Sequence, residues 1–156
     1  MSLLNKSILM LFLLGIAAHG QTGNIVLEKI NLARAAEGKA ALAPLPPALE
    51  SISASYLETL GSQLLQQGEC DHNRQLWGQL QSTASPLAFH PIGEVIACPA
   101  QRGYWSEQRV VDTWLNSTIH HAILVERPNS SYFNCGLFAS GPSETAICIT
   151  WSGPKQ

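Results

Sequence analysis

Four cysteines constrain the fold more than any other feature of this 156-residue sequence. They are Cys70, Cys98, Cys135 and Cys148, and all of them follow an apolar N-terminal stretch. An even number of cysteines in an exported chain indicates disulfides, and four cysteines allow three different pairings. No Cys-x-x-Cys spacing is present, so a zinc site built from cysteines is not favoured.

A turn between the last two cysteines favours one of these pairings. Two short β-prone runs flank Gly141-Pro142, which is a strong turn signal. A hairpin centred on this turn places the third cysteine opposite the fourth, which leaves the first two to pair with each other. The predicted disulfides are therefore Cys70–Cys98 and Cys135–Cys148.

The first twenty residues are typical of a secretory signal peptide. Lys6 precedes an apolar core over residues 7–18, and small residues lead up to Gly20. The apolar run is shorter than the roughly 20 residues that a transmembrane helix needs. We therefore expect cleavage after Gly20, a secreted or periplasmic protein, and a single domain over residues 21–156 with no transmembrane anchor.

The charge of the chain excludes some partners. It has nine basic and eleven acidic residues, and one of the basic residues lies in the leader, so the mature chain carries a net charge of about −3. No basic cluster is present, which argues against nucleic acid as a partner.

The order of the expected elements indicates an α+β fold. Helical spacing of apolar residues and capping residues predict helices early and late in the chain, with one short strand between them and the hairpin at the end. This order favours an antiparallel sheet flanked by helices. The expected elements are helices over 24–37, 47–68, 106–115 and 117–124, a linker over 39–47, one helical turn near 73–80, and a strand over 94–98.

A carboxylate within an apolar stretch is the most informative single residue. Glu94 precedes Val95 and Ile96 in the short predicted strand. Burial of a carboxylate is costly unless the group is paired, so we expect a partner, and a histidine is the obvious one. His72 and His120 are the candidates, although His72 beside an acidic neighbour also fits a surface residue, and His120 also fits a helix residue that only bonds to backbone.

Several motifs taken together resemble the CAP superfamily, which includes cysteine-rich secretory proteins, antigen 5 and plant pathogenesis-related proteins. Each motif alone is weak, but their order and spacing match bacterial members over nearly the whole mature chain. The motifs are Asn-x-x-Arg over 31–34, Gly-Glu-Val-Ile-Ala over 93–97, Trp-x-x-Ser-x-x-His over 114–120, and the strand pair that contains residues 135–138 and 149–151.

The resemblance implies an α-β-α sandwich with a central cavity. In that family two histidines in the cavity can bind a divalent metal such as zinc, with acidic residues beside them. His72 and His120 match the two histidines, and Glu94 matches one acidic residue. Two departures stand out, because Val95 replaces the usual Asn and His121 stands where Arg is common. The candidate supporting residues are Glu107, Asp112 and Ser117, while His121 and His90 are expected at the rim and in a loop.

Three functions follow from these residues. The leading hypothesis is an exported binding or interaction module, with a lipid or sterol-like molecule or another secreted protein as ligand. The first alternative is a protease-like, metal-dependent hydrolase in which Glu94 acts as general base. The second is a structural envelope protein held together by disulfides. Neither His-Glu-x-x-His nor Gly-x-Ser-x-Gly is present, so the balance lies against an enzyme.

Overall fold

The computed structural model describes residues 24–154 of the chain. The predicted signal peptide lies outside the described residues. Two helices, α1 (Asn24–Ala36) and α2 (Pro47–Gln67), are separated by the two-residue strand β1 (Ala43–Pro44). The elements that follow are α3 (Arg74–Ala84), the 3-10 turn η1 (Ser85–Leu87), β2 (His90–Gln101), α4 (Glu107–Leu115), α5 (Thr118–His121), the π-helical turn η2 (Ala122–Glu126), β3 (Tyr132–Ser140) and β4 (Ser143–Ser152).

A four-stranded sheet with the order β1-β3-β4-β2 forms the centre of the molecule. Strands β3 and β4 form the predicted hairpin, and β2 pairs antiparallel with β4. The short β1 lies parallel to β3, which makes the sheet mixed rather than purely antiparallel. The α+β class expected from the sequence is confirmed.

Both predicted disulfides are present. Cys135 lies directly opposite Cys148 across the hairpin, and the bond joins the two strands. The second disulfide joins Cys70, which lies between α2 and α3, to Cys98 on β2. The Cys135–Cys148 bond therefore stabilises the sheet, and the Cys70–Cys98 bond connects the sheet to the segment between α2 and α3.

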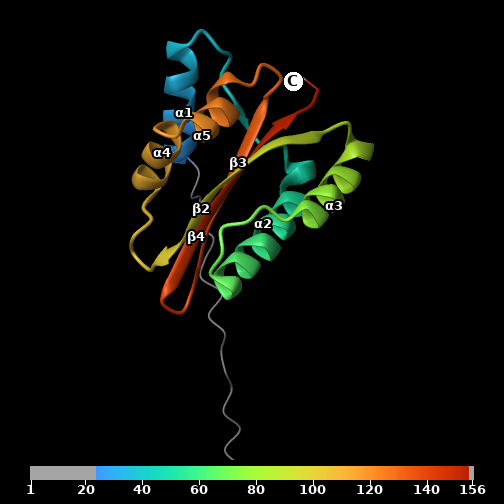
Figure 1. Cartoon of the computed structure of the whole chain (residues 1–156). Helices are drawn as coiled ribbons and strands as arrows, with labels where there is room; N and C mark the ends of the chain where they lie inside the picture. Colours follow the sequence, from blue (N-terminus) through green and yellow to red (C-terminus); the bar gives the residue numbers. More distant parts are fainter. Residues whose placement is uncertain (1–23, 155–156) are drawn as a thin grey trace, which may run out of the picture.

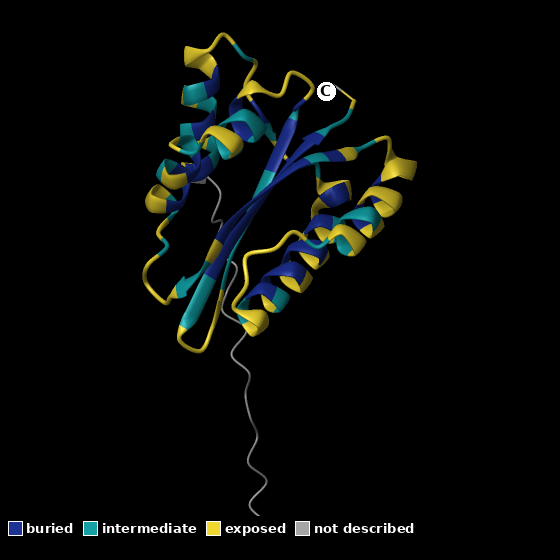
Figure 2. Cartoon of the chain, in the orientation of Figure 1, coloured by how far each residue is buried: buried dark blue, intermediate teal, exposed yellow. Residues whose placement is uncertain are grey.

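Helices cover both faces of the sheet, and each face has its own hydrophobic core (Figure 1). One core packs α1, α4 and η2 against the sheet, and the other packs α2 and α3 against the opposite face. Strand β4 serves both cores, because successive side chains of a strand point to opposite faces. Ala146 and Cys148 belong to the first core, whereas Ile147 and Ile149 belong to the second. The strands at the centre are accordingly buried along most of their length (Figure 2).

The structure differs from the sequence-based expectation in three elements. Strand β2 has 12 residues rather than the five expected, because β4 pairs with it from His90 to Gln101 with two register shifts. Helix α3 continues to Ala84, well past the single turn predicted. The helix expected to run to Leu124 becomes π-helical at Ala122. The local spacing of apolar residues does not reveal contacts between segments that are distant in the sequence.

A buried arginine holds the π-helical turn in place. Arg34 on α1 is 1% exposed and donates hydrogen bonds to the carbonyl oxygens of Leu124 and Val125, each at 3.1 Å. It also donates to the carbonyl oxygen of Ala40 at 2.8 Å. Burial lowers the pKa of Arg34. These bonds supply donors for carbonyl groups near the end of η2, where no further helical N–H groups follow to bind them.

Two glycines on different helices give a matched test of the packing between α2 and the sheet. A methyl group at Gly61 of α2 would lie 2.6 Å from Cγ of Phe138 on β3, whereas one at Gly78 of α3 would meet nothing within 4 Å. Alanine has a higher helix propensity than glycine, so Gly78→Ala should stabilise the protein by about 0.5–1 kcal/mol. Gly61→Ala should instead destabilise it by about 1–3 kcal/mol, because Phe138 must move. Urea unfolding of both variants measures the two signs, and stabilisation by both substitutions would contradict the described packing.

Candidate functional site

A buried carboxylate on β2 is the centre of the candidate site. The side chain of Glu94 is 5% exposed. It lies opposite Ile149 of β4, and with Ile96 it faces the layer formed by α2 and α3. Val95, the next residue along the strand, points to the other core. The alternation of the strand thus directs the carboxylate toward α2.

A tyrosine on α2 satisfies one oxygen of this carboxylate. The hydroxyl of Tyr56 donates a hydrogen bond to Oε2 of Glu94. Burial, together with the nearby charge of Glu94 and this hydrogen bond, raises the pKa of Tyr56 well above its usual range. The ring of Trp77 on α3 packs edge-on against the tyrosine, with 6.1 Å between ring centroids. Tyr56 was not singled out from the sequence, because it falls in the apolar stripe of its helix.

A histidine from the segment between α2 and α3 satisfies the other oxygen. Nδ1 of His72 lies 2.6 Å from Oε1 of Glu94, so a histidine partner for this carboxylate is found as predicted. The hydrogen bond to Glu94 raises the pKa of His72, and the charges of Glu94 and Asp71 add to this effect while burial opposes it. In the neutral ring, donation from Nδ1 leaves Nε2 as an unprotonated nitrogen.

The second predicted histidine, His120, lies in the short helix α5. Nδ1 of His120 lies 2.9 Å from Oγ of Ser117, so Ser117 orients the ring. Burial lowers the pKa of His120, and the positive charge of His72 lowers it further. Within residues 24–154, neither Nε2 atom has a recorded hydrogen bond.

The two histidines come from opposite layers of the fold. His72 follows α2, and His120 belongs to the layer of α1, α4 and α5 (Figure 1). Strand β2 is at the edge of the sheet, and it is contacted by α3 from one layer and by η2 from the other. Gly93 permits a close approach there, because a methyl group at this position would lie 2.6 Å from Cγ2 of Ile123. This contact explains why a glycine precedes Glu94.

Other candidate residues lie elsewhere. Asp112 forms an ion pair with Lys29 of α1 at 3.1 Å, and hydrogen bonds from Gln108 and Lys29 lower its pKa. Among the described residues, Glu107 has no recorded contact with the histidine pair. His121, expected at the rim, lies between Glu37 and Glu126, at 3.2 and 3.3 Å. His90, expected in a loop, is exposed and begins β2.

A polar groove lies beside His72, with a volume of about 260 Å³. Leu60 and Leu64 of α2 contribute its apolar side, and amide and charged side chains contribute the rest. Ligand pockets are commonly about 300–1,000 Å³ and mostly apolar. This groove is therefore small and polar by comparison, and it opens next to the more exposed of the two histidines.

The donor set fits a metal only in part. Both Nδ1 atoms are engaged by protein groups, that of His72 by Glu94 and that of His120 by Ser117, and such contacts orient histidines that bind a metal through Nε2. However, residues 24–154 contain no group of three or more histidine, cysteine or acidic side chains placed to hold one ion. Zinc usually takes three or four protein ligands. The arrangement therefore fits a weak two-histidine site with solvent in the remaining positions, not a closed zinc site.

Comparison with known proteins supports the fold. A comparison with known protein families finds no matching family, and one with curated protein sequences finds no significant match. Among solved structures, an outer surface protein from Borrelia burgdorferi is similar, with a TM-score of 0.66 and 15% sequence identity. The match covers 88% of this chain and 97% of that protein. At this identity the similarity concerns the fold alone.

Two further observations concern location. No helix in the described part of the chain is both long enough and apolar enough to cross a bilayer. The two disulfides favour an oxidising environment outside the cytosol, because cytosolic thiols are kept reduced.

Removal of the charge at Glu94 should alter the titration of His72. In Glu94→Gln the pKa of His72 should fall toward its ordinary value of about 6.5, because the main cause of its elevation is lost. A histidine with a raised folded pKa stabilises the fold below its unfolded pKa, and this contribution is lost as the pH rises through the folded pKa. The stability lost in His72→Ala should therefore shrink as the pH rises above about 6.5.

Proton NMR titration of the imidazole resonances, with Tyr56→Phe as control, separates the two partners of Glu94. Tyr56→Phe removes only the hydrogen bond to Oε2, so the pKa of His72 should stay raised. In His72→Ala the pKa of His120 should rise, because a neighbouring positive charge is lost. An unchanged pKa of His72 in Glu94→Gln would show that the two groups do not interact in solution.

Proposed function

We propose that this chain is an exported CAP-type binding module that engages a ligand through the imidazoles of His72 and His120. One observation carries the proposal. Two histidines from opposite layers have their Nδ1 atoms fixed by Glu94 and Ser117. Such fixed rings present Nε2 in a defined direction, which is what a metal ion or a hydrogen-bonding ligand requires.

The roles of the motif residues support the CAP assignment. Asn31 and Arg34 of the Asn-x-x-Arg motif both bind the segment after α1: the amide of Asn31 exchanges two hydrogen bonds with the backbone of Leu42, and Arg34 binds Ala40. The Gly-Glu motif supplies the close approach at Gly93 and the carboxylate of the site. Helix α1 and strand β2 thus carry these two motifs in the order that the resemblance implies.

A divalent metal such as zinc is the simplest ligand for the pair. His72 and His120 would hold it through Nε2, and Glu94 and Ser117 would keep the two rings oriented. When bound, the ion would supply a positive charge and open coordination positions for an oxygen of a partner molecule. Metal binding requires both imidazoles to be neutral, so a proton competes with the ion.

The groove beside His72 favours one of the two ligand classes expected from the sequence. Its amide and charged lining suits polar groups of another secreted protein, and its volume of about 260 Å³ is small for a lipid or sterol-like molecule. We therefore propose a protein partner, met in the periplasm or outside the cell. The disulfides support such a location.

A hydrolytic role has less support. Both oxygens of Glu94 are engaged, one by Tyr56 and one by His72. A general base needs a free oxygen within reach of the water that it activates. In this arrangement the carboxylate orients His72, and residues 24–154 contain no group of three or more histidine, cysteine or acidic side chains placed to hold a catalytic metal ion. We therefore put the binding role first.

Metal titration of purified protein tests the proposal. At pH 8, where fewer protons compete with the metal than at neutral pH, isothermal titration calorimetry with Zn²⁺ should detect one site per chain. His72→Ala and His120→Ala should each weaken binding by more than tenfold, because each removes one of two ligands. Glu94→Gln and Ser117→Ala should weaken it by about 10–100-fold, which is typical when the side chain that orients a metal ligand is lost.

His90→Ala is the matched control, because His90 is an exposed histidine at the start of β2 and has no recorded contact with the pair. Its zinc affinity should equal that of the wild type. Zinc uptake that is the same in His72→Ala, His120→Ala and His90→Ala would overturn the metal part of the proposal.

A further inference from the structure

The two disulfides differ in their exposure to solvent. Cys70 and Cys98 are both exposed, whereas Cys148 is 1% exposed and Cys135 is half-buried in the hairpin. Thiol–disulfide exchange requires a thiolate to reach a sulfur atom, so access governs its rate. An external reductant can therefore approach one bond and not the other.

The segment that carries His72 has few other attachments. Helix α2 ends at Gly68, which adopts a left-handed conformation with φ of 68°, and residues 69–72 are all exposed. Within the described part of the chain, the backbone of residues 69–72 makes no recorded hydrogen bond. The recorded attachments of these residues are the disulfide at Cys70 and the contact between His72 and Glu94.

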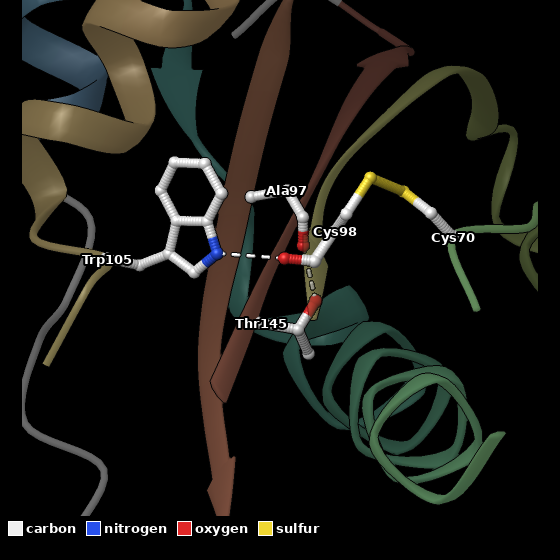
Figure 3. Close-up of a disulfide and its surroundings, with 5 residues drawn as sticks. All are labelled: Cys70, Ala97, Cys98, Trp105 and Thr145. Carbon is white, nitrogen blue, oxygen red and sulfur yellow. Dashed lines mark hydrogen bonds between the residues drawn. A yellow bond between two sulfur atoms is a disulfide. The ribbon is translucent and has the colours of Figure 1, made fainter. Parts of the chain in front are cut away.

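The other end of this disulfide is firmly anchored (Figure 3). The pairing of β2 with β4 shifts register between Ala97 and Ala100, so Cys98 lies at an irregularity of the strand. Side-chain hydrogen bonds replace the backbone bonds between strands at this point. Trp105 Nε1 donates to the carbonyl oxygen of Cys98 at 2.9 Å, and Thr145 Oγ1 donates to the carbonyl oxygen of Ala97 at 2.5 Å. If the bond is broken, Cys98 should keep its place while the segment with Cys70 moves.

From these observations we propose that the Cys70–Cys98 disulfide is a site of reversible thiol–disulfide exchange that controls whether His72 is held against Glu94. We define residues 68–73 as the His72 segment. The oxidised bond holds this segment on β2, and reduction releases it. As a form of regulation, the inference rests on the proposed binding function, but the movement of the segment can be measured without any ligand.

The co-reactant is a dithiol, either a small molecule or a protein with two neighbouring thiols. A thiolate of the dithiol attacks one sulfur of the bond, forms a mixed disulfide and releases the other cysteine as a thiolate, which takes up a proton. The second thiol of the reagent then attacks the mixed disulfide and releases the remaining cysteine. Two electrons and two protons pass from the dithiol to Cys70 and Cys98, and the dithiol leaves as a disulfide.

The contact between His72 and Glu94 is too weak to replace the covalent bond. It is one side-chain contact, and the side chain of His72 is 57% exposed although Glu94 is buried, so the backbone of the segment is not held by it. On the helix side, Asn73 remains bound to Gln63 and caps α3. The His72 segment would then be fixed mainly at its two ends, next to α2 and α3, with its middle free to move.

The test begins with selective reduction. The protein is treated with dithiothreitol under non-denaturing conditions, thiols are alkylated at intervals, and peptide mapping by mass spectrometry locates the label. Label should enter Cys70 and Cys98 at least tenfold faster than the hairpin cysteines. Equal rates, or faster labelling of the hairpin cysteines, would overturn the selectivity on which the proposal depends.

Backbone ¹⁵N relaxation then measures the release of the segment. In the oxidised protein, residues 69–73 should have order parameters near 0.85, and after selective reduction they should fall below about 0.6. The double variant Cys70→Ser with Cys98→Ser should match the reduced protein, and added dithiothreitol should change it no further. Order parameters that stay the same on reduction would overturn the proposal, whatever the protein binds.

Zinc titration of the double serine variant separates this inference from the proposed function. The variant has no thiols from this pair to bind zinc, so a loss of affinity of at least tenfold relative to the oxidised wild type reports the release of His72. If the segment loosens but the oxidised protein binds no zinc, the metal proposal fails and the exchange site stands. If the segment loosens and zinc affinity is unchanged, control of His72 by this disulfide is overturned.

Discussion

The rest of the site depends on a carboxylate that is buried in the edge strand of the sheet. A charged group removed from water costs several kcal/mol unless donors compensate it. Glu94 receives such compensation from Tyr56 on one side and from His72 on the other. These donors come from a helix and from the segment that follows it, so the carboxylate links both to β2. Because the buried charge needs these two donors, both oxygens of Glu94 are occupied, and this favours an orienting role over a catalytic one.

Three other contacts bring the remaining parts to this carboxylate. Gly93, the neighbour of Glu94, gives Ile123 room to pack against the strand and so brings the layer of His120 close. Arg34 fixes the π-helical turn that follows α5 by binding the carbonyl groups of Leu124 and Val125. The exposed disulfide ties the other histidine's segment to the same strand. Of these three supports, Gly93 and Arg34 are buried, whereas solvent can reach the Cys70–Cys98 disulfide.

Sequence reasoning found those features that leave a local mark. The turn between the last two cysteines fixed the hairpin pairing, and a carboxylate among apolar residues implied a histidine partner, which is His72. Tyr56 was missed because an apolar helix stripe gives no sign that one hydroxyl faces a strand distant in sequence. Asp112 was a reasonable candidate from its helix, but its ion pair with Lys29 depends on how α1 packs against α4. The length of β2 likewise depends on its pairing with β4 and not on its own residues.

The central claim is that Glu94 fixes the ring of His72 so that Nε2 is left for a ligand. Long-range ¹H–¹⁵N NMR of the imidazole, recorded above the pKa of His72, tests it most directly because the nitrogen shifts distinguish the two neutral tautomers. The account predicts that the proton is on Nδ1, where Oε1 of Glu94 lies 2.6 Å away, and that Nε2 is unprotonated. A neutral ring with its proton on Nε2 would contradict the account.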